Sequence, residues 1–305
     1  DLSIVLLSHN RRNALGRELP SFLNLVASSG CELIVVDNAS TDGSRELAAE
    51  LIEGCAGARL IANEINFGVA GGRNIGWRAA NRTFILNIDD DISVPSASME
   101  AMAGLLRTSG HVGIVSPVIA DFRSGAAQYT YGNAAIEIAN FQGACHMVRR
   151  DLVARLAYND ESCSFGGEEL DLSIRVRAAG FSVVFVPRAR VLHDHIHRAE
   201  KDARDRRKRW LYNFVRIHHK HFPPREAWLF SARYFVTHTI SGVRSFGPVF
   251  ALSLLGAAAQ GVRDGRRQHS RVPDHVVRFY RNPELRPDFG NVPLWSKAKL
   301  LFARR

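Results

Sequence analysis

The chain has 305 residues, of which 46% are hydrophobic and 23% are charged, and its formal net charge is +10. Those proportions are ordinary for a globular protein, and the length suits one large domain or a domain with an appendage. A core of that size needs no disulfide staples. The four cysteines are scattered without a C-x-x-C pair, which favours reduced thiols in a cytoplasmic setting over a disulfide framework. The positive charge indicates an anionic partner: nucleic acid, an acidic membrane surface or a substrate with phosphate groups.

The first ninety residues alternate short apolar runs with helical patterns. Strands are expected at 2–8, 33–36, 59–62 and 83–88, and helices at 15–27, 45–52 and 71–80. Runs that do not alternate with polar residues are typical of parallel strands covered on both faces. Polar residues follow the strands, and ligands bind at the carboxyl ends of strands in open α/β sheets. The sequence therefore predicts an α/β fold with a mostly parallel, Rossmann-like sheet flanked by helices.

The pattern changes along the rest of the chain. Further strands are expected at 112–117, 144–148 and 182–187, and a helix at 167–180. Beyond residue 198 the strand pattern fades into a basic, aromatic segment and an apolar one, followed by a loop or tail at 287–293. The apolar segment is broken by glycine and proline before it reaches the ~20 residues of a spanning helix. We therefore expect a catalytic domain at 1–197 and a mainly helical extension at 198–305.

An acidic triplet ends the fourth expected strand. Residues Asp89, Asp90 and Asp91 follow an apolar run directly. Side chains two apart on a strand point the same way, so Asp89 and Asp91 are expected to converge on one cation while Asp90 faces elsewhere. Oxygen ligands suit Mn2+ or Mg2+, which keep open positions for substrate phosphates. Three adjacent carboxylates also repel one another unless a cation compensates them, which favours a metal site over a solvated turn.

A second polar segment, V-V-D-N-A-S-T-D-G-S, follows the second expected strand. Its Asp37 lies where a carboxylate can accept hydrogen bonds from a nucleobase or ribose. The Ser and Thr residues that follow are suited to capping the next helix, and Asp42-Gly43 to the turn before it.

In their order along the chain, these blocks resemble a family 2 glycosyltransferase of the inverting GT-A type. The similar segments are L-S-H-N-R, I-V-V-D-N-A-S-T-D-G-S, a glycine-rich stretch that ends in R-N-I-G, N-I-D-D-D, and F-G-G-E-E-L-D, which is similar to the E-D-x-D start of a helix. They extend over residues 2–195. Within the family, these segments are most similar to the rhamnosyltransferase-like branch, which includes enzymes of cell-surface polysaccharide and natural-product assembly.

The resemblance implies a donor site for a UDP- or dTDP-sugar. In it, Asp37 contacts the uracil or thymine, and Arg73 lies beside the base or the diphosphate. Asp89 and Asp91 bind the metal, and Asp90 meets the sugar. Glycines beside such a site let the backbone approach a ligand closely. The donor-binding residues it implies are Ser8, His9, Asn10, Asp37, Asn66, Gly68, Arg73, Asp89 and Asp90.

The E-E-L-D segment supplies the expected catalytic base. Inverting transfer needs a carboxylate that takes the proton of the acceptor hydroxyl. The second acidic residue of the resembled motif is the usual base and corresponds to Glu169. The family commonly has Asp at that position, so the longer side chain here leaves Glu168 and Glu169 both as candidates. The structural alternative is that acidic residues simply favour the first turn of a helix.

A histidine-rich segment, V-L-H-D-H-I-H, follows the last expected strand. The resemblance places His193 as the third metal ligand. His195 is a weaker candidate, and a zinc site made of histidines alone would lack a fourth ligand.

Other functions stay open at this point. The segment 198–225 holds ten Lys and Arg against three Asp and Glu, a net charge of +7. It would suit nucleic acid, but that partner leaves the carboxylates unexplained. We favour contact with an anionic membrane or acceptor on the inner face of the cell membrane, which would suit a glycan or lipid-linked acceptor. A nucleotidyltransferase is a second enzymatic alternative, although it usually has a glycine-rich loop after the first strand. The apolar C-terminal segment offers a surface for a homo-oligomer.

Overall fold

The computed structural model describes residues 1–128, 131–194 and 200–282. Its centre is a sheet in the order β3-β2-β1-β4-β8-β6-β9-β5, with β7 paired to β9. The strands are β1 (Leu2–Ser8), β2 (Glu32–Asp37), β3 (Ala58–Ala62), β4 (Phe84–Asp89), β5 (Ile92–Ser93), β6 (Val112–Asp121), β7 (Ile136–Glu137), β8 (Cys145–Arg149) and β9 (Ser182–His193).

Six of these strands run in the same direction. β3, β2, β1 and β4 pair in parallel, and so do β6 and β9. β8 runs antiparallel between β4 and β6, while the two-residue strands β5 and β7 run antiparallel to β9. The predicted α/β fold with a mostly parallel sheet is confirmed.

Helices cover both faces of this sheet. One face is packed by apolar side chains of α1 (Arg12–Ser29), α2 (Ser44–Ile52) and α4 (Ser96–Thr108). The other is packed by α3 (Gly68–Ala79), α5 (Arg150–Arg155) and α6 (Glu168–Ala178). The strand residues between them are almost all buried, which explains their unalternated apolar sequences.

β9 is longer than the sequence indicates. The expected strand ended at Pro187, but β9 continues to His193. The pairing with β6 shifts register between Val186 and Arg190, so Pro187 lies at an irregularity of the ladder. A bulge of this kind tolerates proline, which has no N–H to donate.

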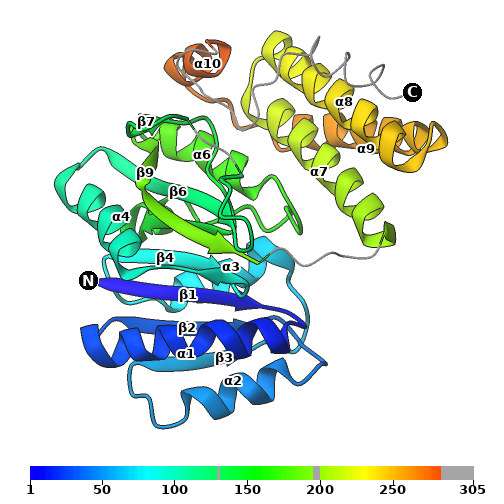
Figure 1. Ribbon diagram of the computed structural model, residues 1–305. Helices are drawn as coiled ribbons and strands as arrows, with labels where there is room; N and C mark the ends of the chain where they lie inside the picture. Colours follow the sequence, from blue (N-terminus) through cyan, green and yellow to red (C-terminus); the bar gives the residue numbers. More distant parts are fainter. Residues whose placement is uncertain (129–130, 195–199, 283–305) are drawn as a thin grey trace.

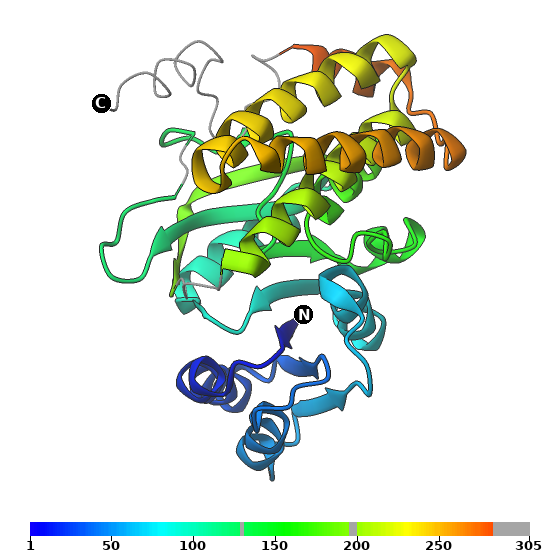
Figure 2. The same ribbon diagram turned by 90° about the vertical axis from the view of Figure 1, so that its right-hand side faces the viewer.

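The last helices pack beyond α6, at the end of the molecule away from β1–β3 (Figures 1 and 2). They are α7 (Glu200–His221), α8 (Pro224–Phe246), α9 (Val249–Arg267) and α10 (Asp274–Arg281). Only Gly247-Pro248 interrupts the apolar segment, since Gly242 and Gly256 lie inside helices. Among the described residues, no helix is both long enough and apolar enough to cross a membrane. The boundary expected at 197/198 and the tail expected at 287–293 lie outside the described residues.

α7 is not a solvated charged helix along its whole length. Its second half is buried against α6 and α9, and Arg216 has no exposed surface. The Arg216 guanidinium donates to Asp160 at 2.9 Å and to Gln268 at 2.6 Å. Lys220 donates to Asp160 and to Asp171 at 2.8 and 2.9 Å. These contacts attach the C-terminal helices to α6.

Candidate active site at the carboxyl edge of the sheet

The carboxyl ends of the parallel strands bring the predicted site residues to one edge. In the register of the sheet, Ser8 on β1 lies opposite Asp37 on β2, and Leu7 lies opposite Asp89 on β4. His193 ends β9 opposite Ile92, just after the acidic triplet. Parallel strands align their ends in this way, so residues far apart in sequence share one rim.

The acidic triplet turns rather than continuing as a strand. β4 ends at Asp89, and Asp90 and Asp91 form a turn before β5. The argument that Asp89 and Asp91 share a face while Asp90 points elsewhere required extended backbone, and it is wrong for that reason. Arg11 lies 3.9 Å from Asp90 and 3.7 Å from Asp91, so both carboxylates lie near the same guanidinium.

His193 and Asp91 are in direct contact. Nε2 of His193 lies 3.1 Å from Oδ1 of Asp91, and both side chains are largely buried. Among the described residues, no group of three or more His, Cys, Asp or Glu side chains is already arranged as a metal shell. Oδ1 of Asp89 accepts instead from Arg73 at 2.9 Å. The metal-ligand roles of Asp89, Asp91 and His193 therefore stay a prediction.

The charge of this cluster fits a divalent cation. Burial, together with the neighbouring carboxylates of Asp91 and Asp89, raises the pKa of Asp90 to about 7, against the opposing effects of Ser8 and Arg11. Burial likewise raises the pKa of Asp89. Burial and the neighbouring carboxylates both disfavour the charged forms of these groups, and a bound cation would favour them. Carboxylate oxygens with an imidazole suit Mn2+ or Mg2+.

Arg73 of α3 lies at the centre of the cluster. Its Nη2 donates to Oδ1 of Asp89 and to the carbonyl oxygen of Gly143, both at 2.9 Å, and its Nη1 donates to Oε1 of Glu168 at 3.2 Å. The side chain is 3% exposed. The predicted contact of Arg73 with the base or the diphosphate is untested, and the structure adds a role in joining β4 to α6.

Glu168 and Glu169 begin α6, as expected from the E-E-L-D segment. Gly167 precedes them with φ 100°, a conformation that favours glycine. Burial raises the pKa of Glu168 to about 8, with a further contribution from Glu169. Burial also raises the pKa of Glu169, whereas Arg73 lowers it. Glu168 is buried and held by Arg73, while Glu169 keeps partial exposure to solvent.

Asp37 is buried and has one free oxygen. Its Oδ2 accepts from the backbone N–H of Ser40 at 3.1 Å and from Nε of Arg45 at 3.2 Å. Its Oδ1 has no hydrogen-bond partner among the residues that the structure describes. A buried acceptor left without a partner is costly, so this atom is suited to a donor group on a ligand.

The predicted base-pocket residues differ in their environment. Ser8 is buried beneath the rim, whereas His9 and Asn10 are exposed. Asn10 has φ 54°, and its Oδ1 accepts from the N–H of Thr41 at 2.8 Å. It therefore also joins the loops that follow β1 and β2.

The glycine-rich loop is organised by a residue that the sequence reasoning did not select. Nδ2 of Asn38 donates to Oδ1 of Asn66 at 2.9 Å and to the carbonyl oxygen of Gly68 at 3.0 Å. Gly68 has φ 72°, and a Cβ there would lie 2.6 Å from the carbonyl oxygen of Ser164. The glycine thus lets the loop approach the segment before α6.

Two further residues of the site were missed. Arg11 could have been found as a cation placed directly after the first strand. Gly143 had no signal in the sequence, because its importance arises from tertiary contact. A Cβ at Gly143 would collide with the carboxylate of Glu169 and lie 3.1 Å from Nη1 of Arg73.

The sequence matches two family models over stretches that include this edge. The model for glycosyl transferase family 2 matches residues 3–156, which is half of the chain. The model for glycosyl transferase family group 2 matches residues 84–260. The chain belongs to glycosyl transferase family 2. It is therefore a glycosyltransferase, as the sequence motifs predicted. These family models do not distinguish the branches of the family, so the rhamnosyltransferase-like assignment stays a prediction. Among curated proteins, none matches the sequence significantly.

Solved structures share the fold of this family 2 glycosyltransferase. A mannosyltransferase from Pyrobaculum calidifontis, in complex with GDP-Man and Mn2+, matches with a TM-score of 0.59 at 16% identity over 86% of this chain and 87% of that chain. S. aureus TarS, residues 1–349 in complex with UDP-GlcNAc, matches with a TM-score of 0.64 at 14% identity over 90% of this chain and 82% of that chain. GalNAc-T7 with UDP, GalNAc and Mn2+ matches with a TM-score of 0.60 at 15% identity over 88% of this chain and 56% of that chain. At these identities the likeness shows the GT-A fold.

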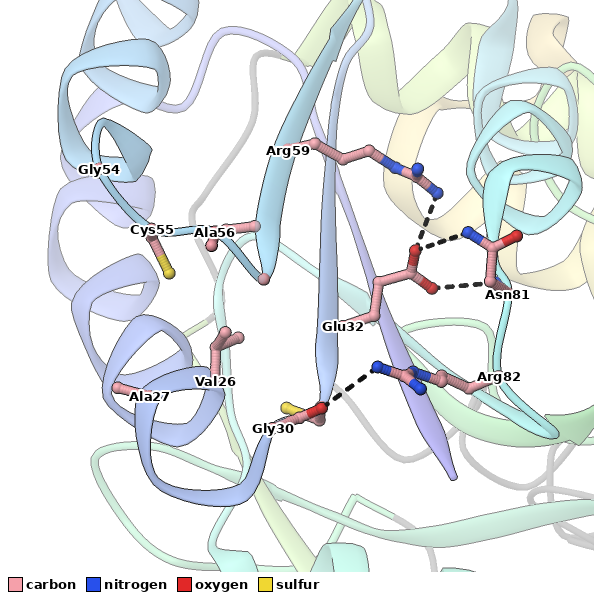
Figure 3. Close-up of a pocket in the computed structure, with 13 residues that line it drawn as sticks. Val26, Ala27, Gly30, Glu32, Gly54, Cys55, Ala56, Arg59, Asn81 and Arg82 are labelled. Carbon is pink, nitrogen blue, oxygen red and sulfur yellow. Dashed lines mark hydrogen bonds and ion pairs between the residues drawn. The ribbon is translucent and has the colours of Figure 1, made fainter.

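A surface hollow of about 700 Å³ lies at the opposite edge of the glycosyltransferase sheet (Figure 3). Glu32 at the start of β2 accepts there from Ser3, Arg59 and Asn81 at 2.6 to 3.1 Å. Its carboxylate is thus fully paired, and the net effect of these contacts lowers its pKa in spite of burial. The hollow lies at the amino ends of the strands and holds no excess of acidic groups, so we assign it no part in sugar transfer.

Proposed function

We propose that this glycosyltransferase moves a sugar, with inversion, from a UDP- or dTDP-sugar to an acceptor hydroxyl, with Mn2+ or Mg2+ bound at the acidic turn. One observation carries the proposal. A single buried guanidinium, that of Arg73, contacts both the metal-side Asp89 and the base-side Glu168. This contact supports a transfer site in which the metal-binding turn and the acidic start of α6 lie next to each other.

The nucleotide would lie along the carboxyl ends of β1 and β2. The unpaired Oδ1 of Asp37 is suited to accept from the N–H of a uracil or thymine ring. Ser8, His9 and Asn10 would line the same pocket from the loop after β1. Asn66 and Gly68, which Asn38 holds in place, would bring backbone close to the donor.

The metal would be held by Asp91, His193 and Asp89. When bound, the cation neutralises the developing charge of the leaving diphosphate. Arg11, near both Asp90 and Asp91, adds a fixed positive charge at the same place. Asp90, whose raised pKa favours a protonated carboxyl near neutral pH, is suited to hydrogen-bond the sugar hydroxyls.

Glu169 is the favoured base, with Glu168 as the alternative. A base must reach the acceptor hydroxyl, and Glu169 retains exposure whereas Glu168 is buried and held by Arg73. Burial strengthens Glu169 as a base by raising its pKa. Glu168 would then keep Arg73 in place. Gly143 leaves room for the Glu169 carboxylate.

Turnover of the two glutamine variants tests this assignment. Glu169→Gln should lower transfer by about a hundredfold or more while donor binding is retained, as for a lost general base. The measurement is release of nucleoside diphosphate with Mn2+ present, together with donor affinity by calorimetry. Glu168→Gln is the matched comparison. Full activity of Glu169→Gln with loss in Glu168→Gln would move the role to Glu168, and full activity of both would reject a carboxylate base on α6.

The acceptor is inferred from the family resemblance and the basic segment, not from the residues of the site. We propose a glycan or lipid-linked acceptor of polysaccharide or natural-product assembly, met by a cytoplasmic enzyme at the inner face of the membrane. The division into a catalytic part at 1–197 and a helical extension at 198–305 belongs to the same proposal. The family match favours sugar transfer over the nucleotidyltransferase and nucleic-acid alternatives.

A further inference from the structure

The turn between α8 and α9 presents an apolar stripe to solvent. Val249, Leu252 and Leu255 follow one another along the first turns of α9 and are 77%, 68% and 54% exposed. Their spacing of three residues places them on one side of the helix. We call these three residues the tip stripe. Large apolar side chains gathered on one exposed face mark an interaction surface.

The stripe is not left over from packing on the inner side of α9. Phe250 and Leu254, on the opposite side, are buried with Leu211 and Val215 of α7. Gly261 and Gly265 bring the rest of α9 against the α7 backbone. The helix is thus apolar both toward α7 and toward solvent at its start, and the second face needs its own explanation.

Lys and Arg side chains lie around the end of the molecule where α8 and α9 meet. Arg204 and Arg207 of α7 lie over the ring of Phe246 at 5.2 and 5.7 Å, and Lys208 lies 5.9 Å from the ring of Phe250. Arg244, near the end of α8, is exposed. Asp205 pairs with Lys208 at 3.4 Å. Apolar side chains bordered by Lys and Arg are the pattern of helices that lie in the headgroup region of anionic bilayers.

The position of the tip agrees with such a partner. In Figure 1 the turn between α8 and α9 lies on the side toward which the arrowheads of β1 and β4 point. This is the side of the carboxyl edge, where the acidic turn lies. A surface that meets the tip would therefore lie on the same side of the molecule as the candidate active site (Figure 1).

We infer that the tip stripe inserts into an anionic lipid bilayer, with Arg204, Arg207, Lys208 and Arg244 against the lipid headgroups. Docking at the tip turns the carboxyl edge of the sheet toward the same membrane. The lipid contact is inferred from α7, α8 and α9 and does not depend on the proposed function. Only its consequence, a membrane-borne acceptor, rests on that function. The sequence had indicated the basic segment 198–225 as the membrane contact, whereas the tip lies at the turn between α8 and α9.

Co-sedimentation with vesicles tests the inference on the full chain. The vesicles are phosphatidylcholine alone or phosphatidylcholine mixed with phosphatidylglycerol. The protein should bind the mixed vesicles and be released by salt. Replacing both leucines, Leu252→Ser with Leu255→Ser, should lower the binding constant about a hundredfold, at about tenfold per buried leucine. Arg204→Glu with Arg244→Glu should lower it by at least tenfold, because each cation contributes about fivefold and each reversal adds repulsion.

Leu229→Ser is the matched control. Leu229 is 59% exposed, comparable to Leu255, but it lies 17 residues before Phe246, about 25 Å along α8. Its loss should leave vesicle binding unchanged. Equal binding of neutral and anionic vesicles, or equal loss in Leu229→Ser and the tip variant, would overturn the inference. So would a dimer in sedimentation velocity that the tip substitutions dissociate, since the stripe would then belong to a second copy. Donor-dependent nucleotide release, measured without vesicles, separates failure of this inference from failure of the proposed function.

Discussion

Nη1 of Arg73 lies 3.2 Å from Oε1 of Glu168, and each side chain is 3% exposed. This pair joins α3 to the first turn of α6, and the same guanidinium contacts Asp89 at the end of β4. A buried cation with two acidic partners is difficult to replace, because its loss leaves both Asp89 and Glu168 without their shared donor in a medium of low polarity. The pair therefore determines both the stability of this edge and the position of the acids on it.

Arg73→Met should be strongly destabilising. We expect a loss of about 3 to 5 kcal/mol in the free energy of unfolding, measured by urea titration, as for other broken buried pairs. Arg78→Met is the control on the same helix, since Arg78 pairs with Glu161 at 2.8 Å while both side chains are half exposed. Its cost should be at most about 1 kcal/mol. Equal effects of the two substitutions would contradict the central position of Arg73.

Asp160 should make the fold sensitive to acid. Burial and the nearby Asp171 raise its pKa, but hydrogen bonds from Lys220 and Ser162 and the charge of Arg216 outweigh them and lower the pKa to about 2. A depressed pKa stabilises the fold above the ordinary carboxyl pKa of about 4, and this contribution is lost as pH falls toward 2. With allowance for partial exposure, it amounts to about 1 to 2 kcal/mol.

Asp160→Asn tests that dependence. The variant should be less stable than the parent at neutral pH, and the difference should shrink between pH about 4 and 2, followed by circular dichroism during urea unfolding at each pH. Asp205→Asn serves as the control, because Asp205 is exposed on α7. A constant difference between Asp160→Asn and the parent across this range would show that the native pKa is not depressed.

Two glycines of α9 should respond oppositely to alanine. A Cβ at Gly265 would collide with the carbonyl oxygen of Arg216, whereas a Cβ at Gly256 would meet no atom of the described part of the chain within 4 Å. Gly265→Ala should separate α9 from α7 and cost about 1 to 3 kcal/mol. Gly256→Ala should stabilise by about 0.5 to 1 kcal/mol, because glycine is unfavourable inside a helix. The melting temperature of each variant measures these effects. A lower melting temperature for Gly256→Ala would contradict this helix packing.

The sequence contains the local parts of this fold but not their tertiary contacts. The run Leu2–Ser8 is continuously apolar because it lies between two helical layers, and it was predicted with its observed bounds. β9 was cut short at Pro187, since the bulge that accommodates this proline depends on the register against β6. The turn at Asp90 was missed because three aspartates after a strand do not show where the strand ends.

The same limit applies to the site. Asp37 and Glu168 could be selected because one ends a strand and the other begins a helix, each with a recognisable polar pattern. Arg73 lies inside α3 and could be selected only because its R-N-I-G segment resembles the family. Gly143 could not, because its contacts with Glu169 and Arg73 form only when β8 pairs with β4. The buried half of α7 was hidden for a similar reason. Arg216 obtains its partners Asp160 and Gln268 from segments more than 50 residues away.

The most direct test of metal-dependent nucleotide-sugar binding is a thermal-shift measurement with UDP, dTDP and GDP, each with and without Mn2+. Ligands that bind only the native state raise its melting temperature. The account predicts that UDP or dTDP stabilises the protein with Mn2+ present and much less without it, and that Asp91→Asn loses the metal-dependent part while unfolding cooperatively. Stabilisation by these nucleotides that is equal with and without Mn2+, and unchanged in Asp91→Asn, would contradict it.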